Sequence, residues 1–375
     1  MKKLLSSILA LILCFSLLST FSLAATVDED STHIQELEYD RVVDLPDGGK
    51  DYVYIIEGIE NHYLVPPEDF NPLTATDAQL ERYCFPARPE IVNGISDQNE
   101  DQSTEYSEWV KLMENYSGTP DPDLSIRITP ITDENNEATT RATSSRTSKI
   151  WSGYESNLGA NSSAFYTQVQ VDFKQPTISA TSGSCLNSYW VGLGGRNTPK
   201  LVQAGTATEG KSNHYAWYEY LSDSTGQTVE MQVIPNLSIS AGDNIHVYIS
   251  FQKANGKFGY YVANNTTGKS ASGYVDNLPS STQFDGTTAE WIVERCSMVS
   301  GSTSIPYNLG KYGTVTMSNC KATLNSSNTW LGASDLSGLY KVTMTSNGQS
   351  SGTVLSLPGS LSSNNSFTCT WKAYK

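Results

Sequence analysis

The sequence predicts an all-β fold, an antiparallel sandwich or barrel, over roughly its last 230 residues. Apolar and polar side chains alternate from Phe165 to Phe173 and from Ile245 to Phe251, as in strands with one buried face. Asn255-Gly256 and Asn347-Gly348 each separate two strand-like runs, and this dipeptide is a strong hairpin signal. No convincing helical pattern of ten residues occurs in this region, which is long enough for one large β domain.

The charge of the chain is concentrated in its N-terminal part. The 375 residues include 39 acidic and 24 basic side chains, a net charge of −15. From Ala25 to Ser145 there are 27 acidic and 7 basic residues, whereas from Arg146 to Lys375 there are 12 acidic and 15 basic ones. The lack of a basic excess excludes a nucleic-acid binder, because such a protein must neutralise phosphates. The 7 Trp, 21 Tyr and 10 Phe exclude a disordered acidic protein.

Residues 1–24 are expected to be a secretory signal peptide. Lys2-Lys3 gives a basic start, Ile8 to Leu18 form a mostly apolar run, and Ser22 and Ala24 have the spacing of a signal-peptidase site. The apolar run is too short for a membrane span, and no later stretch approaches 18 apolar residues. We therefore expect a secreted, extracellular protein whose mature form has no membrane segment.

Residues 25–131 are predicted to be an acidic pro-segment, either a small α+β unit or a partly ordered one. Tyr52 to Ile59 has the composition of a strand. Thr76-Asp77-Ala78-Gln79 has the Thr-x-x-Gln form of a capping box, which predicts a short helix that runs to about Tyr83. A second helix is expected near Glu105 to Met113.

Residues 132–149 are expected to form an exposed linker with a processing site, and residues 150–375 the β domain. The linker is rich in Thr, Ser, Glu and Asn and has no apolar periodicity. Its basic residues Arg141, Arg146 and Lys149 are candidate cleavage points, because proteolysis concentrates in exposed segments.

Four cysteines lie in the β domain: Cys185, Cys296, Cys320 and Cys369. Secretion into an oxidising compartment predicts disulfides among them, and four cysteines allow three pairings. Their wide spacing differs from the close ligand pairs of a zinc knuckle, so we expect no metal.

Two motifs suggest other chemistries but have simpler explanations. Gly205 to Ser212 matches the phosphate-loop pattern GxxxxGK[ST], yet the residues that follow look like a strand rather than the helix that such a loop requires. We expect a turn there and no nucleotide site. His214 and His246 are expected to be ordinary strand residues, and a serine hydrolase built around either is the weakest functional alternative.

Two carboxylates, Glu290 and Glu294, occur in an otherwise apolar strand. A period of two places both of them with Ile292 on one face, and Trp291 with Val293 on the other. The two carboxylates are about 13 Å apart at a rise of about 3.3 Å per residue, so they cannot share a proton. A strand carboxylate that faces an aromatic concavity is able to act as a general base, whereas the simpler interpretation is a solvent-exposed face.

Several segments of the C-terminal region match, in order, the motifs of one known family. They are Ile150 to Gly153, Trp190 to Gly195, Leu201 to Gly205, Ala216 to Glu219, Asn264 to Ser270 and Ala289 to Glu294. The string A-E-W-I-V-E together with W-V-G and L-x-Q-x-G is fairly specific. On these residues the chain, from about 148 to its end, resembles the glutamic peptidases, also called eqolisins.

The resemblance implies a sandwich of two large, curved antiparallel sheets and a secreted endopeptidase that is made as a zymogen and needs no cofactor. It implies a catalytic Gln-Glu dyad, which here is Gln203 of L-x-Q-x-G and Glu294, the second glutamate of A-E-W-I-V-E. Trp151, Trp217 and Glu219 match positions near the family's substrate groove. The substrate would be a polypeptide, and we expect a monomer.

The chain departs from the family at three positions. Acid-active members carry Asp residues where this chain has Arg196-Asn197, Ala207 and Tyr215. Clustered carboxyls share protons and support activity at very low pH, so their loss argues against a strongly acidic optimum. Tyr215 is a further substrate-binding candidate.

An alternative from a different class is a carbohydrate- or surface-binding β-sandwich without catalysis. The missing Asp residues, the near-neutral domain and the aromatic-rich strand Tyr215 to Tyr220 favour it, since such a strand can line a groove or fill a core. In the peptidase hypothesis, the acidic segment, which lies in the stretch Ala25 to Ser145 with an excess of 20 negative charges, is expected to act as an intramolecular inhibitor that covers the groove until it is released.

Overall fold

The computed structural model describes most of the chain beyond residue 33, within one compact unit of residues 33–375. The expected signal peptide and Arg141 of the expected linker lie outside the described residues. Those residues are 34–56, 58–89, 99–129, 145–197, 200–221, 229–276, 278, 286–300, 303–325, 327 and 329–374.

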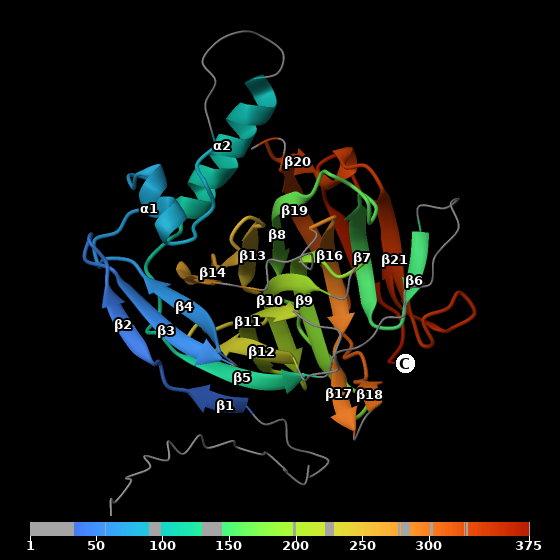
Figure 1. Ribbon diagram of the computed structural model, residues 1–375. Helices are drawn as coiled ribbons and strands as arrows, with labels where there is room; N and C mark the ends of the chain where they lie inside the picture. Colours follow the sequence, from blue (N-terminus) through green and yellow to red (C-terminus); the bar gives the residue numbers. More distant parts are fainter. Residues whose placement is uncertain are drawn as a thin grey trace, which may run out of the picture. The chain divides into compact units, whose positions relative to one another are not determined.

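One layer of the fold is an antiparallel ladder that carries the predicted dyad (Figure 1). Its strands are, from edge to edge, β21 (Leu339–Thr345), β7 (Trp151–Asn157), β16 (Thr288–Arg295), β9 (Leu186–Gly194), β10 (Leu201–Glu209), β11 (Asn213–Leu221), β12 (Val229–Ile234), β5 (Leu124–Thr129) and β1 (Ile34–Leu37).

The second layer packs against the first, with β13, β8 and β14 in contact with β9 and β10. The last strand of the second layer, β22 (Val354–Pro358), also pairs with β21 of the first layer, so the two layers join into one continuous sheet. The strand order is β2 (Arg41–Asp44), β3 (Lys50–Ile56), β4 (Ile59–Val65), β15 (Lys269–Val275), β14 (Lys257–Asn264), β13 (Asn244–Gln252), β8 (Tyr166–Lys174), β19 (Thr314–Leu324), β23 (Phe367–Trp371) and β22 (Val354–Pro358).

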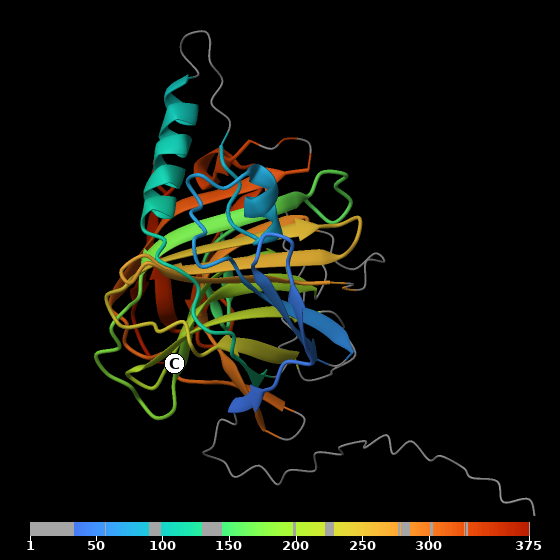
Figure 2. The ribbon, with the colours of Figure 1, turned by 90° about the vertical axis from the view of Figure 1, so that its left-hand side faces the viewer.

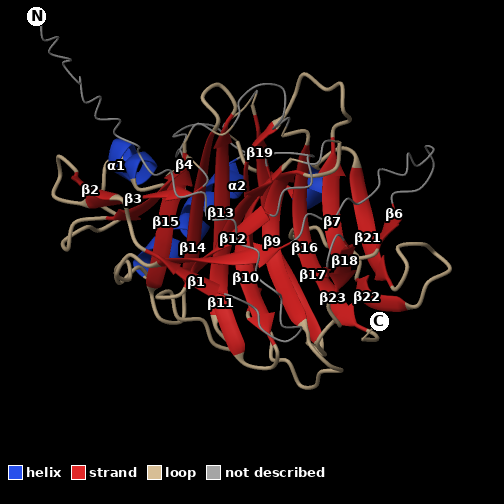
Figure 3. Cartoon of the chain, turned by 60° about the horizontal axis from the view of Figure 1, so that its bottom comes forward, coloured by secondary structure: helices blue, strands red, loops and turns tan. Residues whose placement is uncertain are grey.

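The remaining elements are small, and strands dominate the described fold (Figure 3). They are the helices α1 (Asp77–Arg82) and α2 (Asn99–Glu114), the strand β6 (Ser145–Ser148), which runs parallel to β21, the hairpin β17 (Ser297–Ser300) and β18 (Thr303–Pro306), β20 (Leu331–Gly332) and the 3₁₀ turn η1 (Ala333–Asp335). The predicted all-β sandwich and both predicted hairpins are confirmed.

The alternation of side chains along β9 divides the molecule into a core and an outer face. Tyr189, Val191 and Leu193 point into the main core between the layers, where they meet side chains of β8, β13 and β14. Trp190 points the other way and joins a second apolar cluster on the outer face of the first layer. Because each strand of this layer alternates in the same way, its polar outward residues are gathered on one surface.

The two helices of the N-terminal segment were both expected, although α2 is longer than predicted. Thr76 and Gln79 form the capping box at the start of α1. The expected helix near Glu105 to Met113 is α2, which begins earlier than predicted. The prediction missed its first turns because their residues are polar and show no apolar periodicity. Trp109 and Met113 of α2 pack in a cluster with Tyr261 on the second layer.

The N-terminal segment is part of the sandwich rather than a separate unit. Its strand β4 pairs with β15 at the edge of the second layer, and β5 pairs with β12 at the edge of the first. Figure 2 views the molecule from the side on which β2, β3 and β4, in blue, lie beside the golden strands of the second layer. Tyr54, Tyr63 and Leu124 belong to the same core as the β domain. The segment and the domain therefore share one hydrophobic core.

The end of the expected linker is structured. Ser145–Ser148 forms β6, and Arg146 donates to both carboxylate oxygens of Glu155. The side chain of Arg146 is 6% exposed and that of Glu155 is fully buried. The expectation that Arg146 is exposed is therefore wrong: its guanidinium is buried beside the Glu155 carboxylate, which needs a cation next to it.

Arg146→Ala is expected to lower the free energy of unfolding by about 3–5 kcal/mol, since it removes a partner of a buried carboxylate. Urea unfolding at pH 7 measures this. The matched control is Lys50→Ala, which removes the exposed Lys50–Asp44 pair at 3.2 Å and should cost less than about 1 kcal/mol. Equal costs for the two variants would contradict the role given to Arg146.

The expectation of disulfides is not met in this structure. Cys185, Cys296, Cys320 and Cys369 are all buried free thiols. Cys320 and Cys369 fill space in the main core as small apolar side chains do. Burial raises the pKa of Cys369 to about 12, so this thiol stays protonated at neutral pH.

None of the helices in the described residues is both long and apolar enough to cross a membrane.

Candidate active site

The predicted dyad lies on the outer face of the first layer. Gln203 of β10 is opposite Gly192 of β9, and Gly192 is opposite Glu290 of β16. Glu294, four residues further along β16, is opposite Ser188 of β9. Gln203, Glu290 and Glu294 therefore share one face, while Trp291 and Val293 point into the main core, as predicted.

Gln203 is held by a neighbouring carboxylate. Its Nε2 donates to Oε2 of Glu219 at 2.5 Å, and the two residues are directly opposite on β10 and β11. Because a carboxylate only accepts hydrogen bonds, Glu219 fixes which end of the amide faces it. Gln203 Oε1 is buried and has no hydrogen-bond partner among the described residues. The amide thus keeps an acceptor, and one remaining N–H, for another group.

Glu294 is held by a tryptophan. The Nε1 of Trp190 donates to Oε2 of Glu294 at 2.8 Å, and Trp190 is fully buried. Trp151, opposite Glu294 on β7, packs edge-to-face on Trp190 with 5.3 Å between the ring centroids. The carboxylate is partly exposed and lies beside two indoles. The carboxylate of Glu294 is thus held in place next to an aromatic surface.

Close contacts explain why the last position of the L-x-Q-x-G motif, Gly205, is a glycine. A Cβ on Gly205 would lie 2.2 Å from the carbonyl oxygen of Tyr189 and 2.7 Å from Cβ of Trp190. Gly205 is opposite Trp190 on one side and Trp217 on the other. Because Gly205 has no side chain, the indoles of Trp190 and Trp217 lie on either side of this residue, on the same face as Gln203.

Glu155 and Glu290 continue the row that contains Gln203. Sequence reasoning singled out Glu290 beside Glu294 but not Glu155. Glu290 is fully buried and is opposite Glu155 of β7. Glu155 binds Arg146 and lies 3.5 Å from Nε of Arg196. Arg196, one of the three departures from the family, thus faces Glu155. Glu155 could have been noticed in the sequence, because it is a charged residue at an outward-facing position of an otherwise buried strand.

An arginine of the N-terminal segment also reaches this face. Nη1 and Nη2 of Arg127 donate to the two carboxylate oxygens of Glu209 at 2.8 and 3.2 Å, and Nη1 donates to the Tyr215 hydroxyl at 2.9 Å. No local pattern predicts this contact, because Arg127 and Glu209 are far apart in the chain. The candidates Trp217, Glu219 and Tyr215 all lie here and are buried in this form of the protein.

The two histidines of the weakest alternative lie elsewhere. His246 is on the second layer with Nδ1 2.7 Å from Asp172, but its Nε2 has no hydrogen-bond partner among the described residues, so no serine completes a triad there. His214 lies 2.8 Å from Thr208, and burial lowers its pKa. The phosphate-loop match is a turn between two strands, with Gly210 at φ +61°, as predicted.

A cavity of about 820 Å³ lies away from the dyad. It is lined by Trp109 of α2 and by His246, Asp172 and Lys321 of the second layer. Within the described residues, no group of three or more His, Cys, Asp or Glu side chains is placed to hold a metal ion.

Comparison with known proteins gives one family. The model of the peptidase A4 family matches residues 149–371, more than half of the chain. No curated protein matches the sequence. Among solved structures, scytalido-glutamic peptidase with a transition-state analogue inhibitor is similar at 20% identity and a TM-score of 0.49, over 60% of this chain and 98% of that one.

A second similar structure is SCP-B, described as a member of the eqolisin family, in complex with the tripeptide Ala-Ile-His. It is 19% identical with a TM-score of 0.47, over 60% of this chain and 98% of that one. The family match covers every motif on which the sequence resembled the glutamic peptidases, including Gln203 and Glu294. The chain therefore belongs to the peptidase A4 family, the eqolisins, and is a glutamic-type endopeptidase.

Proposed function

We propose that this protein is a secreted zymogen of an endopeptidase that hydrolyses peptide bonds through Gln203, Glu294 and an activated water. The observation that carries the proposal is that both side chains lie on one face and that each is fixed by a buried neighbour. Glu219 holds the amide of Gln203, and Trp190 holds the carboxylate of Glu294. Fixed groups on rigid strands lose little freedom when a substrate binds.

Glu294 acts as the general base. Its carboxylate takes a proton from a water, and the water oxygen attacks the carbonyl carbon of the scissile peptide bond. The protonated Glu294 then gives that proton to the leaving nitrogen as the C–N bond breaks. Proton transfer of this kind is worth about 10²–10⁴ in rate.

Gln203 stabilises the oxyanion that forms during the attack. One N–H of its amide is bound to Glu219, so the other donates to the developing negative charge on the carbonyl oxygen. Its free Oε1 accepts a hydrogen from the attacking water. Donors of this kind matter most in a buried site, because a low dielectric strengthens their effect.

The substrate lies across the aromatic part of the same face. Trp151, Trp217, Glu219 and Tyr215 border the dyad on neighbouring strands. All four are buried in the chain with its N-terminal segment in place. Access to them therefore requires that a covering part of the molecule move away.

The N-terminal segment is that covering part. It holds the first layer through β5 and Arg127, and the second layer through β4 and the helices. The chain enters the β domain again at β6, so the cut that frees the segment falls between residues 130 and 144. Cleavage there leaves Arg146 in place beside Glu155.

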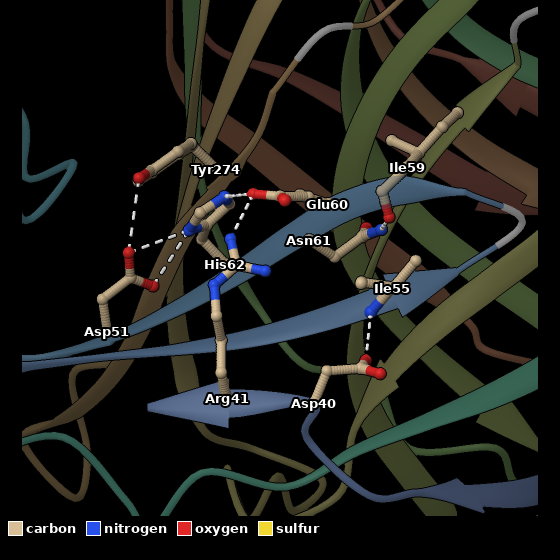
Figure 4. Close-up of polar contacts among 9 residues, drawn as sticks. All are labelled: Asp40, Arg41, Asp51, Ile55, Ile59, Glu60, Asn61, His62 and Tyr274. Carbon is tan, nitrogen blue, oxygen red and sulfur yellow. Dashed lines mark hydrogen bonds and ion pairs between the residues drawn. The ribbon is translucent and has the colours of Figure 1, made fainter. Parts of the chain in front are cut away.

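Contacts of His62 and Asp51 with Tyr274 of β15 join the segment to the domain (Figure 4). The buried His62 of β4 has Nδ1 2.9 Å from Asp51, and its ring stacks on Tyr274 of β15 with 4.0 Å between the centroids. The Tyr274 hydroxyl donates to Asp51 at 3.4 Å, and Arg41 binds Glu60. The hydrogen bond with Arg41 lowers the pKa of Glu60.

A carboxyl group whose pKa is lowered in the folded protein stabilises the folded state at pH values above the ordinary pKa of the group. This contribution is lost as the pH falls through the pKa of the folded state. The Glu60 side chain is 37% exposed, so solvent screens part of its effect. Because Arg41 and Glu60 both belong to the segment, this pair stabilises the segment itself at neutral pH, and its contribution is lost in acid.

The test is proteolysis of an unfolded protein across a wide pH range by the full chain and by a chain cut at a foreign protease site placed between residues 131 and 144. We expect the cut chain to be active and the uncut chain to be much less active at neutral pH. Neither a chelator nor a serine-directed covalent inhibitor should lower the activity. Equal activity of both chains would refute the masking.

Complete absence of proteolysis at every pH, together with sugar binding, would instead support the non-catalytic alternative. N-terminal sequencing of the secreted protein, beside its Glu294→Gln variant, shows in addition whether the chain cuts itself.

A further inference from the structure

A guanidinium group is enclosed on the outer face of the first layer by groups that suit it. Arg127 makes a bidentate contact with Glu209 and a third hydrogen bond with Tyr215. Its carbon Cζ lies 6.0 Å from the centroid of the Tyr215 ring, and its side chain is 3% exposed. Fork-to-fork pairing of this kind is specific for arginine, because a lysine ammonium cannot place two parallel N–H donors on one carboxylate.

The wall of this pocket belongs to the β domain, whereas its occupant belongs to the segment. Glu209 ends β10, Tyr215 is on β11, and Tyr307 follows β18. Tyr307 belongs with Tyr215 to one buried cluster on this face, and Arg127 partly offsets the rise that burial causes in the pKa of Tyr307. When the segment leaves, a carboxylate and two phenols remain around the space that Arg127 filled.

The pocket is in line with the catalytic carboxylate. Tyr215 is opposite Ala207 of β10, Ala207 is opposite Ser188 of β9, and Ser188 is opposite Glu294 of β16. The two residues between Tyr215 and Glu294 are thus small. Three strand spacings of about 4.8 Å make roughly 14 Å, which is the length of about four residues of extended peptide.

Electrostatic interactions place the same groups in one neighbourhood. Burial raises the pKa of the Cys296 thiol well above its ordinary value, and the charges of Glu294, Arg127 and Glu219 all act on this thiol. Cys296 belongs with Tyr215 and Tyr307 to one apolar cluster on this face.

We propose that Glu209 and Tyr215 form a substrate subsite for an arginine side chain about four residues from the scissile bond, and that Arg127 occupies this subsite in the precursor. The inference rests on the proposed peptidase function and names its substrate class, polypeptides with an arginine at that distance. The segment then binds as a substrate does at this subsite.

The first test measures binding without catalysis. In full-length Arg127→Ala, added ethylguanidinium should raise the Tm in a saturable manner, because it refills the vacated pocket. Ethylammonium should do so at higher concentrations only. Arg127→Ala combined with Glu209→Gln should lose the response, whereas Arg127→Ala combined with Glu108→Gln should keep it, since Glu108 pairs with the distant Lys321. The same response in both double variants, or none in Arg127→Ala, would overturn the subsite.

The second test measures specificity in the chain cut at the linker and carrying Arg127→Ala, which empties the pocket even if the segment stays bound. Peptides with arginine at each position around one cleavage site are compared with the same peptides carrying citrulline, which lacks the charge. One position should favour arginine by about 10- to 100-fold in kcat/KM, as charged hydrogen bonds allow, and Glu209→Gln should abolish that preference.

The outcomes separate the inference from the function on which it rests. Cleavage without an arginine preference, or a preference that survives Glu209→Gln, overturns the subsite and leaves the peptidase intact. Saturable guanidinium binding with no cleavage of any peptide contradicts the proposed function and identifies the pocket as the anchor of the segment alone, which overturns its role as a substrate subsite.

Discussion

Glu294→Gln is expected to lower kcat on a peptide substrate by about 10²–10⁴-fold, because the amide cannot take a proton from water. The variant should fold normally. Glutamine has the same length as glutamate, and its carbonyl oxygen still accepts the hydrogen bond from Trp190 that Glu294 accepts at 2.8 Å. The measurement is steady-state cleavage of a fluorogenic peptide by the chain cut at the linker, with circular dichroism as a check of the fold.

Glu290→Gln is the matched control for this variant. Glu290 is on the same strand and the same face, but it is fully buried in the row with Glu155. Its substitution should change activity by a few-fold at most. Loss of activity in Glu290→Gln with normal activity in Glu294→Gln would move the role of the base from one glutamate to the other.

Gln203→Ala is expected to lower kcat by about 10²–10³-fold, or about 2.7–4 kcal/mol, as removal of one oxyanion donor does elsewhere. KM should change little, because the hydrogen bond strengthens only as charge develops on the carbonyl oxygen. Steady-state kinetics on the same peptide separate the two parameters.

Gln203→Glu tests whether the donor or the shape of the side chain matters. It keeps the length of the side chain but replaces the N–H donor by an acceptor and sets a second carboxylate against Glu219, which Gln203 contacts at 2.5 Å. Activity should fall at least as far as in Gln203→Ala. Activity near that of the unchanged chain would show that Gln203 does not stabilise an oxyanion.

Local patterns were sufficient to predict the strands and the sides on which their residues lie. Period-two alternation placed Glu290 and Glu294 together and Trp291 on the other face, and the structure confirms this arrangement. The hairpin at Asn255-Gly256 and the capping box at Thr76 depend on contacts within a few residues, which a sequence shows directly.

The sequence did not reveal contacts between distant segments. Nothing around Arg127 marks its partner Glu209, because the pair forms only when β5 pairs with β12. Arg146 lies in a polar stretch that resembles a linker, and only its backbone pairing with the distant strand β21 makes the stretch a strand. Local propensity is a weak guide where tertiary contacts decide the conformation.

The pairing of β4 with β15 and of β5 with β12 has a consequence for how the protein is made. β4 ends at Val65, and its partner begins at Lys269, about two hundred residues later in the chain. During synthesis the N-terminal part therefore emerges first and has to wait, with unpaired strand edges, for most of the domain.

Such edges pair readily with other chains. The 27 acidic residues against 7 basic ones between Ala25 and Ser145 repel one another and neighbouring copies, and so keep a waiting chain extended and dispersed. The acidic composition of the segment is thus suited to its place in the order of synthesis: this part of the protein is made first and completes its pairing last.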